Sequence, residues 1–138
     1  MSYFINPVKE DQCVFVTYEG RMTLVDIMAA RYEANELLSV KRWKRMVVNI
    51  AELRSTPTTL ELIDLASDLS SDLPRNTRIA LVVRSDQVTH AKLAERVARI
   101  EGMLLTYFFD AEEATLWVKG KNFHQRMKPQ PAGNLVKV

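Results

Sequence analysis

With 138 residues and a mass of 15.8 kDa, the chain is long enough to bury one hydrophobic core. Its 47% hydrophobic and 26% charged residues exclude a disordered or fibrous protein, and its single cysteine excludes an internal disulfide. No leader-like segment and no apolar run of about 20 residues occurs, so we expect a cytoplasmic protein without a transmembrane segment. Residues 119–138 carry cations and no acid, which predicts one domain over 1–118 and a basic, irregular tail over 119–138.

Two strands and a helix are predicted in the first forty residues. The segment Gln12–Tyr18 is rich in β-branched and aromatic residues, which predicts a strand, and Tyr3–Pro7 is expected to pair with it at the sheet edge. Thr23 followed three residues later by Asp26 predicts a capped helix start, and the helix should run to about Ser39.

The apolar residues of this first helix form an unusually wide stripe. A helical period predicts a buried face that consists of Ile27, Ala30, Ala34, Leu37 and Leu38. Four further residues widen it: Val25, Met28, Ala29 and Tyr32. The width indicates either a broad core face, which is the more common explanation, or a surface for a partner.

A second strand and helix follow. The short apolar segment Met46–Ile50 predicts a strand that is covered on both faces. After Pro57, either Thr58 or Thr59 can cap a helix that reaches about Ser70. The inner face of that helix is expected to hold Leu62, Leu65, Ala66 and Leu69.

The remaining elements repeat this alternation. Strands are predicted over Thr77–Val83 and Met103–Phe109, and a helix capped by Asp110 over Ala111–Val118. Another helix should open at Ser85 or Asp86, end at Gly102, and bury Leu93, Ala94, Val97 and Ile100.

Strands that alternate with helices favour right-handed crossovers and a mainly parallel sheet. We therefore expect an α/β domain with a mixed, mainly parallel sheet of about five strands and about four helices. Helices that lie mainly on one side would leave the other side of the sheet in need of cover. We therefore predict a homodimer in which a second copy covers that side of the sheet.

The order of elements resembles the βα superhelix of STAS domains, the module of anti-sigma-factor antagonists and sulfate transporters, and of SEC14-type lipid-binding domains. The resemblance covers about residues 3 to 118, and three segments carry it: Tyr18–Thr23, Val47–Leu53 and Phe109–Trp117. It implies a regulatory, protein-binding module.

In the antagonist branch a serine at the start of the second helix is phosphorylated by a partner kinase, within an Asp-Ser-Ser-Gly segment. The matching residues here are Pro57, Thr58, Thr59 and Leu60, so the hydroxyls are kept while the aspartate and glycine are replaced. Two interpretations of Thr58 and Thr59 follow: a helix cap, which is common for stability alone, and a phosphoacceptor, since a helix N-terminus stabilises an added phosphate.

The sequence favours binding over catalysis. His90 and His124 stand in no nucleophile signature, and Cys13 lies inside a predicted strand. The four glycines are too dispersed for a nucleotide loop, and the chain lacks a zinc-ligand pattern. We expect no cofactor and no metal.

A basic cluster stands between the first helix and the next strand: Lys41, Arg42, Trp43, Lys44 and Arg45. Cations there complement the negative end of the helix, and the tryptophan can fold back on the core. The other interpretation is contact with an anionic surface, either lipid head groups at the membrane periphery or, less favoured, nucleic-acid phosphates.

These features leave two functions of different classes. One is a regulatory interaction module that docks on a protein partner or on a second copy through a helical surface. The other is a SEC14-like carrier of a lipid or small apolar ligand, which the wide apolar helix faces and the six methionines favour.

Overall fold

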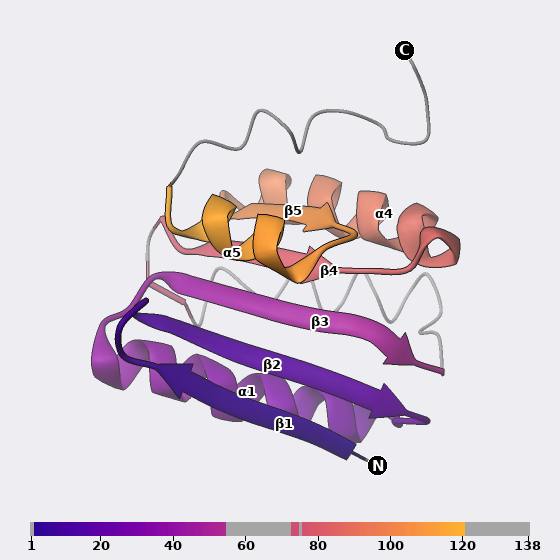
Figure 1. Cartoon of the computed structure of the whole chain (residues 1–138), viewed down its shortest axis with the longest axis horizontal. Coiled ribbons are helices and arrows are strands. Elements are labelled where there is room, and N and C mark those ends of the chain that lie inside the picture. Colours follow the sequence, from indigo (N-terminus) through magenta and orange to yellow (C-terminus); the bar gives the residue numbers. More distant parts are fainter. Residues whose placement is uncertain (1, 55–72, 75, 121–138) are drawn as a thin grey trace.

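The fold is built on one five-stranded sheet with the strand order β1-β2-β3-β4-β5 (Figure 1). This computed structural model describes residues 2–54, 73–74 and 76–120. Strand β1 pairs antiparallel with β2, and the other neighbours pair in parallel, which confirms the mixed, mainly parallel sheet. The strands are β1 (Ser2–Val8), β2 (Cys13–Gly20), β3 (Arg45–Leu53), β4 (Arg78–Val82) and β5 (Leu104–Phe108).

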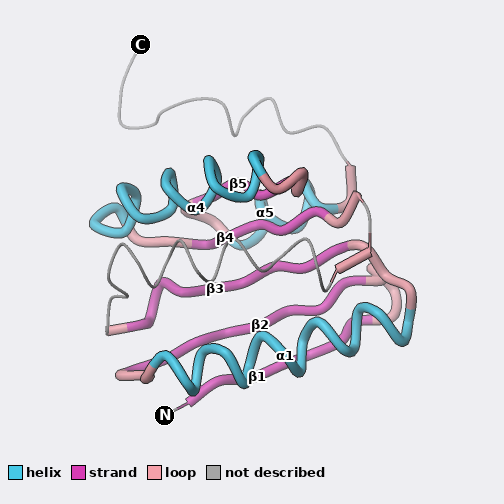
Figure 2. Tube along the Cα trace, turned by 180° about the vertical axis from the view of Figure 1, so that it is seen from behind, coloured by secondary structure: helices cyan, strands magenta, loops and turns pink. Residues whose placement is uncertain are grey.

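Three α-helices cover this sheet within the described residues. Helices α1 (Leu24–Lys41) and α4 (Val88–Ile100) lie on one face, and α5 (Ala111–Val118) lies on the other (Figures 1 and 2). A short 3-10 helix, η1 (Ser85–Gln87), precedes α4. The helix expected after Thr58 or Thr59 lies outside the described residues. No helix in the part of the chain that the structure describes is long and apolar enough to span a bilayer.

The start of α1 is fixed by the predicted capping box. The Thr23 hydroxyl accepts a hydrogen bond from the Asp26 amide, and the Thr23 amide donates to the Asp26 carboxylate, both at 3.1 Å. These two bonds satisfy amides that have no partner inside the helix. At the other end Arg42 takes a left-handed conformation, with φ of 59°, and turns the chain back toward β3.

Strand β3 lies at the centre of two hydrophobic cores. Met46 and Val48 face α1 and α4, whereas Val47 faces α5. The strand is therefore covered on both faces, as predicted for Met46–Ile50. Under α5 the second core consists of Cys13, Val47, Ala80, Val82, Phe108, Ala114, Trp117 and Val118.

Helix α4 faces the sheet with small residues, so its predicted inner face is only partly right. Ala91, Ala94 and Ala98 are buried, whereas Ile100 is 78% exposed. Ile100 follows Ala91 by about two and a half helical turns, so its side chain points away from the sheet. The alanines bring the helix backbone close to β5. Gly102 takes a left-handed conformation, with φ of 83°, just after the end of α4, as predicted.

The face of the sheet that carries α5 is only partly covered. Val82 is buried beneath α5, but Phe4 on β1 is 59% exposed and Phe15 on β2 is half-buried. Helices thus lie mainly on one side, as expected. The homodimer that this asymmetry suggested stays a prediction.

Replacing the cap residue in Thr23→Ala should lower the free energy of unfolding by about 1 kcal/mol, because the Asp26 amide at the start of α1 loses the hydroxyl that accepts its hydrogen bond. Urea denaturation measures the change. Thr89→Ala, at an exposed position inside α4, is the matched control and should lower stability by less than about 0.3 kcal/mol. Equal losses in both variants would contradict the capping role.

Candidate functional site

A group of polar contacts lies at the carboxyl end of the sheet, where β3 extends beyond the end of β4. Pairing between the two strands stops at Asn49 and Val82, whereas β3 continues to Leu53 and pairs there with β2 alone. The carbonyls of β3 that would face a longer β4 therefore need other partners. This end of the sheet is also where parallel α/β folds commonly bind ligands.

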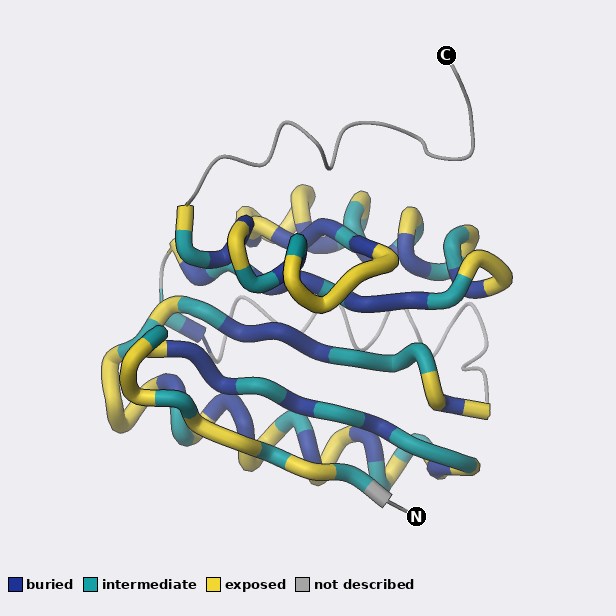
Figure 3. Tube along the Cα trace, viewed as in Figure 1, coloured by how far each residue is buried: buried dark blue, intermediate teal, exposed yellow. Residues whose placement is uncertain are grey.

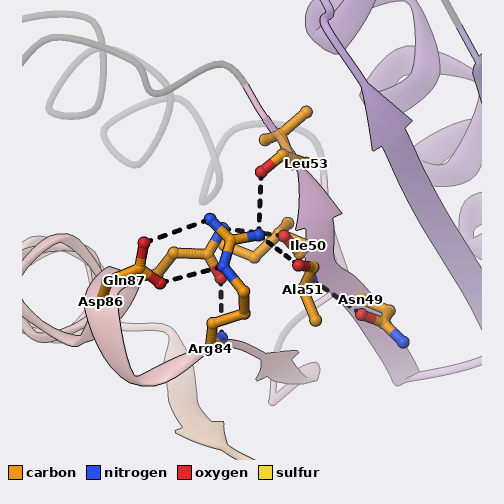
Figure 4. Close-up of polar contacts among 7 residues, drawn as sticks. All are labelled: Asn49, Ile50, Ala51, Leu53, Arg84, Asp86 and Gln87. Atoms are coloured by element: carbon orange, nitrogen blue, oxygen red, sulfur yellow. Dashed lines mark hydrogen bonds and ion pairs between the residues drawn. The ribbon is translucent and has the colours of Figure 1, made fainter.

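Arg84 and Gln87 supply those partners (Figure 4). Arg84 Nη1 donates to the carbonyls of Ala51 and Leu53, the latter at 3.0 Å. The buried Gln87 donates from Nε2 to the Ile50 carbonyl at 2.9 Å and accepts from the Arg84 amide at 2.8 Å. We call these contacts the Arg84 clasp, because they join the end of β3 to the start of α4.

Asp86 orients the guanidinium from the solvent side. Its Oδ1 lies 2.9 Å from Arg84 Nε, with the side chains of Arg84 and Asp86 40% and 70% exposed. The hydrogen bond from Arg84 lowers the pKa of the Asp86 carboxyl, so the pair stays ionised at neutral pH. Exposure limits what this pair adds to stability.

The Arg84 clasp sets the direction in which the chain leaves β3. Asn49 Oδ1 accepts from the Ala51 amide at 2.9 Å, which adds a local bend before the strand ends. Arg54 then donates its amide to the Gly20 carbonyl at 2.8 Å. The segment that follows contains Thr58 and Thr59, which lie outside the described residues, so their role as phosphoacceptors stays a prediction.

The structure divides the basic cluster 41–45 into structural and exposed members. Lys41 Nζ lies 5.0 Å from the centre of the Trp43 ring, and Trp43 packs against the core under α1. Arg45 donates to the Asp11 carbonyl at 2.7 Å. Arg42 and Lys44 are exposed. The folded-back tryptophan fits the structural interpretation, while contact with an anionic surface stays a prediction.

The outer face of the first half of α1 carries four exposed apolar residues. Tyr32 is 69% exposed, Val25 is 74% exposed, and Met28 and Ala29 are exposed beside them. Their spacing of three and four residues places them on one side of the helix (Figure 3 shows buried and exposed segments alternating along α1). The broad core face expected for these residues is therefore wrong, since the sheet takes only the opposite stripe. We call these four residues the α1 outer face.

Cys13 and His90 lie on opposite faces of the sheet. Cys13 is buried in the core under α5, and His90 lies on α4 at the other face of the sheet. Burial raises the pKa of the Cys13 thiol to about 12. No cluster of three or more metal-binding side chains occurs among the described residues. Cys13 and His90 therefore do not form a nucleophile–base pair.

No protein-family model and no curated protein matches the sequence. A solved structure does match: an uncharacterized protein of the DUF3478 family with a SpoIIAA-like fold, from Shewanella loihica PV-4. The match covers 85% of this chain and 92% of the other, with a TM-score of 0.57 and 15% sequence identity. The chain therefore has the SpoIIAA-like fold of STAS domains, which confirms the fold expected from the sequence. At this identity the likeness concerns the fold alone.

Sequence reasoning missed Arg84 and Gln87. Their carbonyl partners on β3 lie 31 to 37 residues away along the chain, so no local sequence pattern predicts the contacts. The available signal was Arg84 itself, a long cation placed between a predicted buried strand and a helix start. Such a position at the carboxyl end of a parallel strand favours a bridging side chain.

Arg84→Met should lower the free energy of unfolding by about 1.5 kcal/mol, because the carbonyls of Ala51 and Leu53 lose a charged donor. Hydrogen exchange of the amides in residues 50–53 should rise. Asp86→Ala is the matched control: it removes only the exposed ion pair and should cost less than about 0.5 kcal/mol. Unchanged exchange in Arg84→Met would refute the clasp.

Cys13 should resist alkylation by iodoacetamide at pH 8 in the native protein. With a pKa near 12 its thiolate fraction is on the order of a thousandfold below that of an unfolded cysteine. Mass spectrometry with and without urea measures the contrast. Rapid modification in the absence of urea would contradict the burial of this thiol.

Proposed function

We propose that the protein is a non-enzymatic interaction module that docks on a protein partner through the α1 outer face. The observation that carries this proposal is the exposed apolar stripe of Val25, Met28, Ala29 and Tyr32. Contiguous apolar groups at a surface favour association, since contact removes them from water.

The composition of the α1 outer face suits protein recognition. Tyr32 offers a large ring with a polar tip, the kind of side chain that dominates binding energy at interfaces. Met28 adapts to irregular surfaces, and Ala29 lets a partner helix approach closely. The helix that presents them is anchored by the capping box at Thr23 and by the buried residues Ala30, Ala34 and Leu38.

A regulatory role would follow if the partner's binding responded to a change at Thr58 or Thr59, as the likeness to antagonist domains suggests. The second candidate, a carrier for a lipid or small apolar ligand, stays a prediction. The exposed stripe supports docking instead, because a carrier shields its apolar residues around the ligand.

A photo-crosslinking phenylalanine analogue in place of Tyr32 tests the proposal. In cells of the source organism, irradiation should yield a covalent adduct with a protein, either a second copy or another chain, identified by mass spectrometry. Val25→Glu should abolish the adduct while changing the free energy of unfolding by less than about 0.5 kcal/mol, because the residue is exposed.

The matched control carries the same analogue in place of Phe109, which is 55% exposed at the end of β5. Position 109 should give no adduct that depends on Val25. An adduct yield at position 32 no higher than at position 109 would contradict the docking function.

A further inference from the structure

We propose that the amino edge of the sheet, opposite the Arg84 clasp, binds the surface of an anionic lipid bilayer. The topology defines this edge: strands β2 to β5 begin there, and α1, α4 and α5 end there (left side of Figure 1). Its cations come from five separate segments and are Lys9, Lys41, Arg42, Lys44, Arg45, Arg78, Arg99 and Lys119. Within residues 2–54, 73–74 and 76–120, the acids at the same edge are Glu10, Asp11 and Glu101.

Some of these cations hold the edge together. Arg78 donates to the Trp117 carbonyl at 2.7 Å and lies over its ring, and Lys119 forms an ion pair of 3.0 Å with Asp11. Arg45 binds the carbonyl of the same aspartate. These contacts fix the β1–β2 turn and the end of α5 against the sheet, so the edge is a rigid platform.

The remaining cations point outward. Lys9, Lys41, Arg42, Lys44 and Arg99 are exposed. Complementing a helix end takes a single cation in its last turn, and Lys41 and Arg99 already provide that for α1 and α4. Arg42 and Lys44 stand beyond the helix, so they exceed what the helix dipole explains. This excess positive charge matches the negative potential of a membrane leaflet.

Exposed aliphatic side chains distinguish a bilayer from a nucleic acid. Val40 is 74% exposed at the end of α1, Ile100 is 78% exposed at the end of α4, and Leu104 is 46% exposed at the start of β5. Peripheral membrane binding combines apolar groups that enter the interface with cations that attract head groups. Binding to nucleic-acid phosphates depends on charged and polar groups and does not explain exposed aliphatic side chains.

The sequence that follows the amino edge is basic in composition. The described chain ends at Gly120, directly after Lys119 at the amino edge, so the tail starts there (Figure 1). Its sequence adds Lys121, Arg126, Lys128 and Lys137 without any acid.

The opposite, carboxyl edge carries the reverse charge. Acids dominate there in the part of the chain that the structure describes, and they are Glu19, Asp26, Glu52, Asp86, Asp110, Glu112 and Glu113, against Arg21, Arg54 and Arg84. A bilayer of negative charge would attract one edge and repel the other. The charge distribution therefore orients the domain so that β2 to β5 start at the membrane and run away from it.

Co-sedimentation of the full chain with vesicles tests this proposal. Vesicles of phosphatidylcholine with about 30% phosphatidylglycerol should bind the protein in a salt-sensitive way, and phosphatidylcholine alone should not. Reversing two charges in the Arg42→Glu/Lys44→Glu variant should lower the partition coefficient more than about 25-fold, since each cation near the surface contributes about fivefold.

The matched control reverses Arg21 and Arg54, which are exposed at the carboxyl edge and give the same change in net charge. It should lower binding less than about threefold. Equal losses in both variants, or full binding by the Arg42→Glu/Lys44→Glu variant, would overturn the proposal, because net charge or the tail alone would then explain the attraction.

The aliphatic residues supply a second readout. Ile100→Ser, an exposed substitution, should weaken vesicle binding about fivefold and leave the salt dependence unchanged. Tighter binding to a duplex RNA of about 20 base pairs than to the anionic vesicles, unaffected by Ile100→Ser, would replace the bilayer with nucleic acid and defeat the proposal.

Discussion

The parallel alignment of β2 to β5 is the constraint on which the rest of this structure depends. Helices α1, α4 and α5 run back against these strands, so each of the three starts at the carboxyl edge and ends at the amino edge. Helix N-termini favour acids and helix C-termini favour cations. Asp26 in the first turn of α1, Asp110 at the N-cap of α5 and Lys41 in the last turn of α1 follow that rule. The sheet direction thus gives the domain two chemically different ends.

Strand β3 connects these ends. Its first residue, Arg45, holds the β1–β2 turn, and its last residues are held by Arg84 and Gln87 from the start of α4. Because β3 extends beyond the end of β4, side chains instead of strand amides donate to the last carbonyls of β3. The Arg84 clasp thus joins the last residues of β3 to the start of α4.

Local signals predicted the fold well, since capping is decided by residues that are near in sequence. Thr23 and Asp110 cap their helices as expected. Tertiary packing decided what local patterns could not. Alanines, rather than the larger Ile100, face the sheet from α4, and the α1 outer face stays in solvent although its composition resembles a core. The carbonyl partners of Arg84 are distant in sequence, so the clasp could not be predicted from local sequence patterns.

The two proposed surfaces are compatible in space. Helix α1 runs along the strands and reaches the amino edge only with its last turn. At 1.5 Å per residue, Tyr32 lies about 13 Å and Val25 about 24 Å from Lys41 along the helix axis. A lipid head-group layer is only about 5 to 8 Å thick. With the amino edge on a bilayer, the α1 outer face would stand clear of the head groups, and a protein partner could dock from the aqueous side.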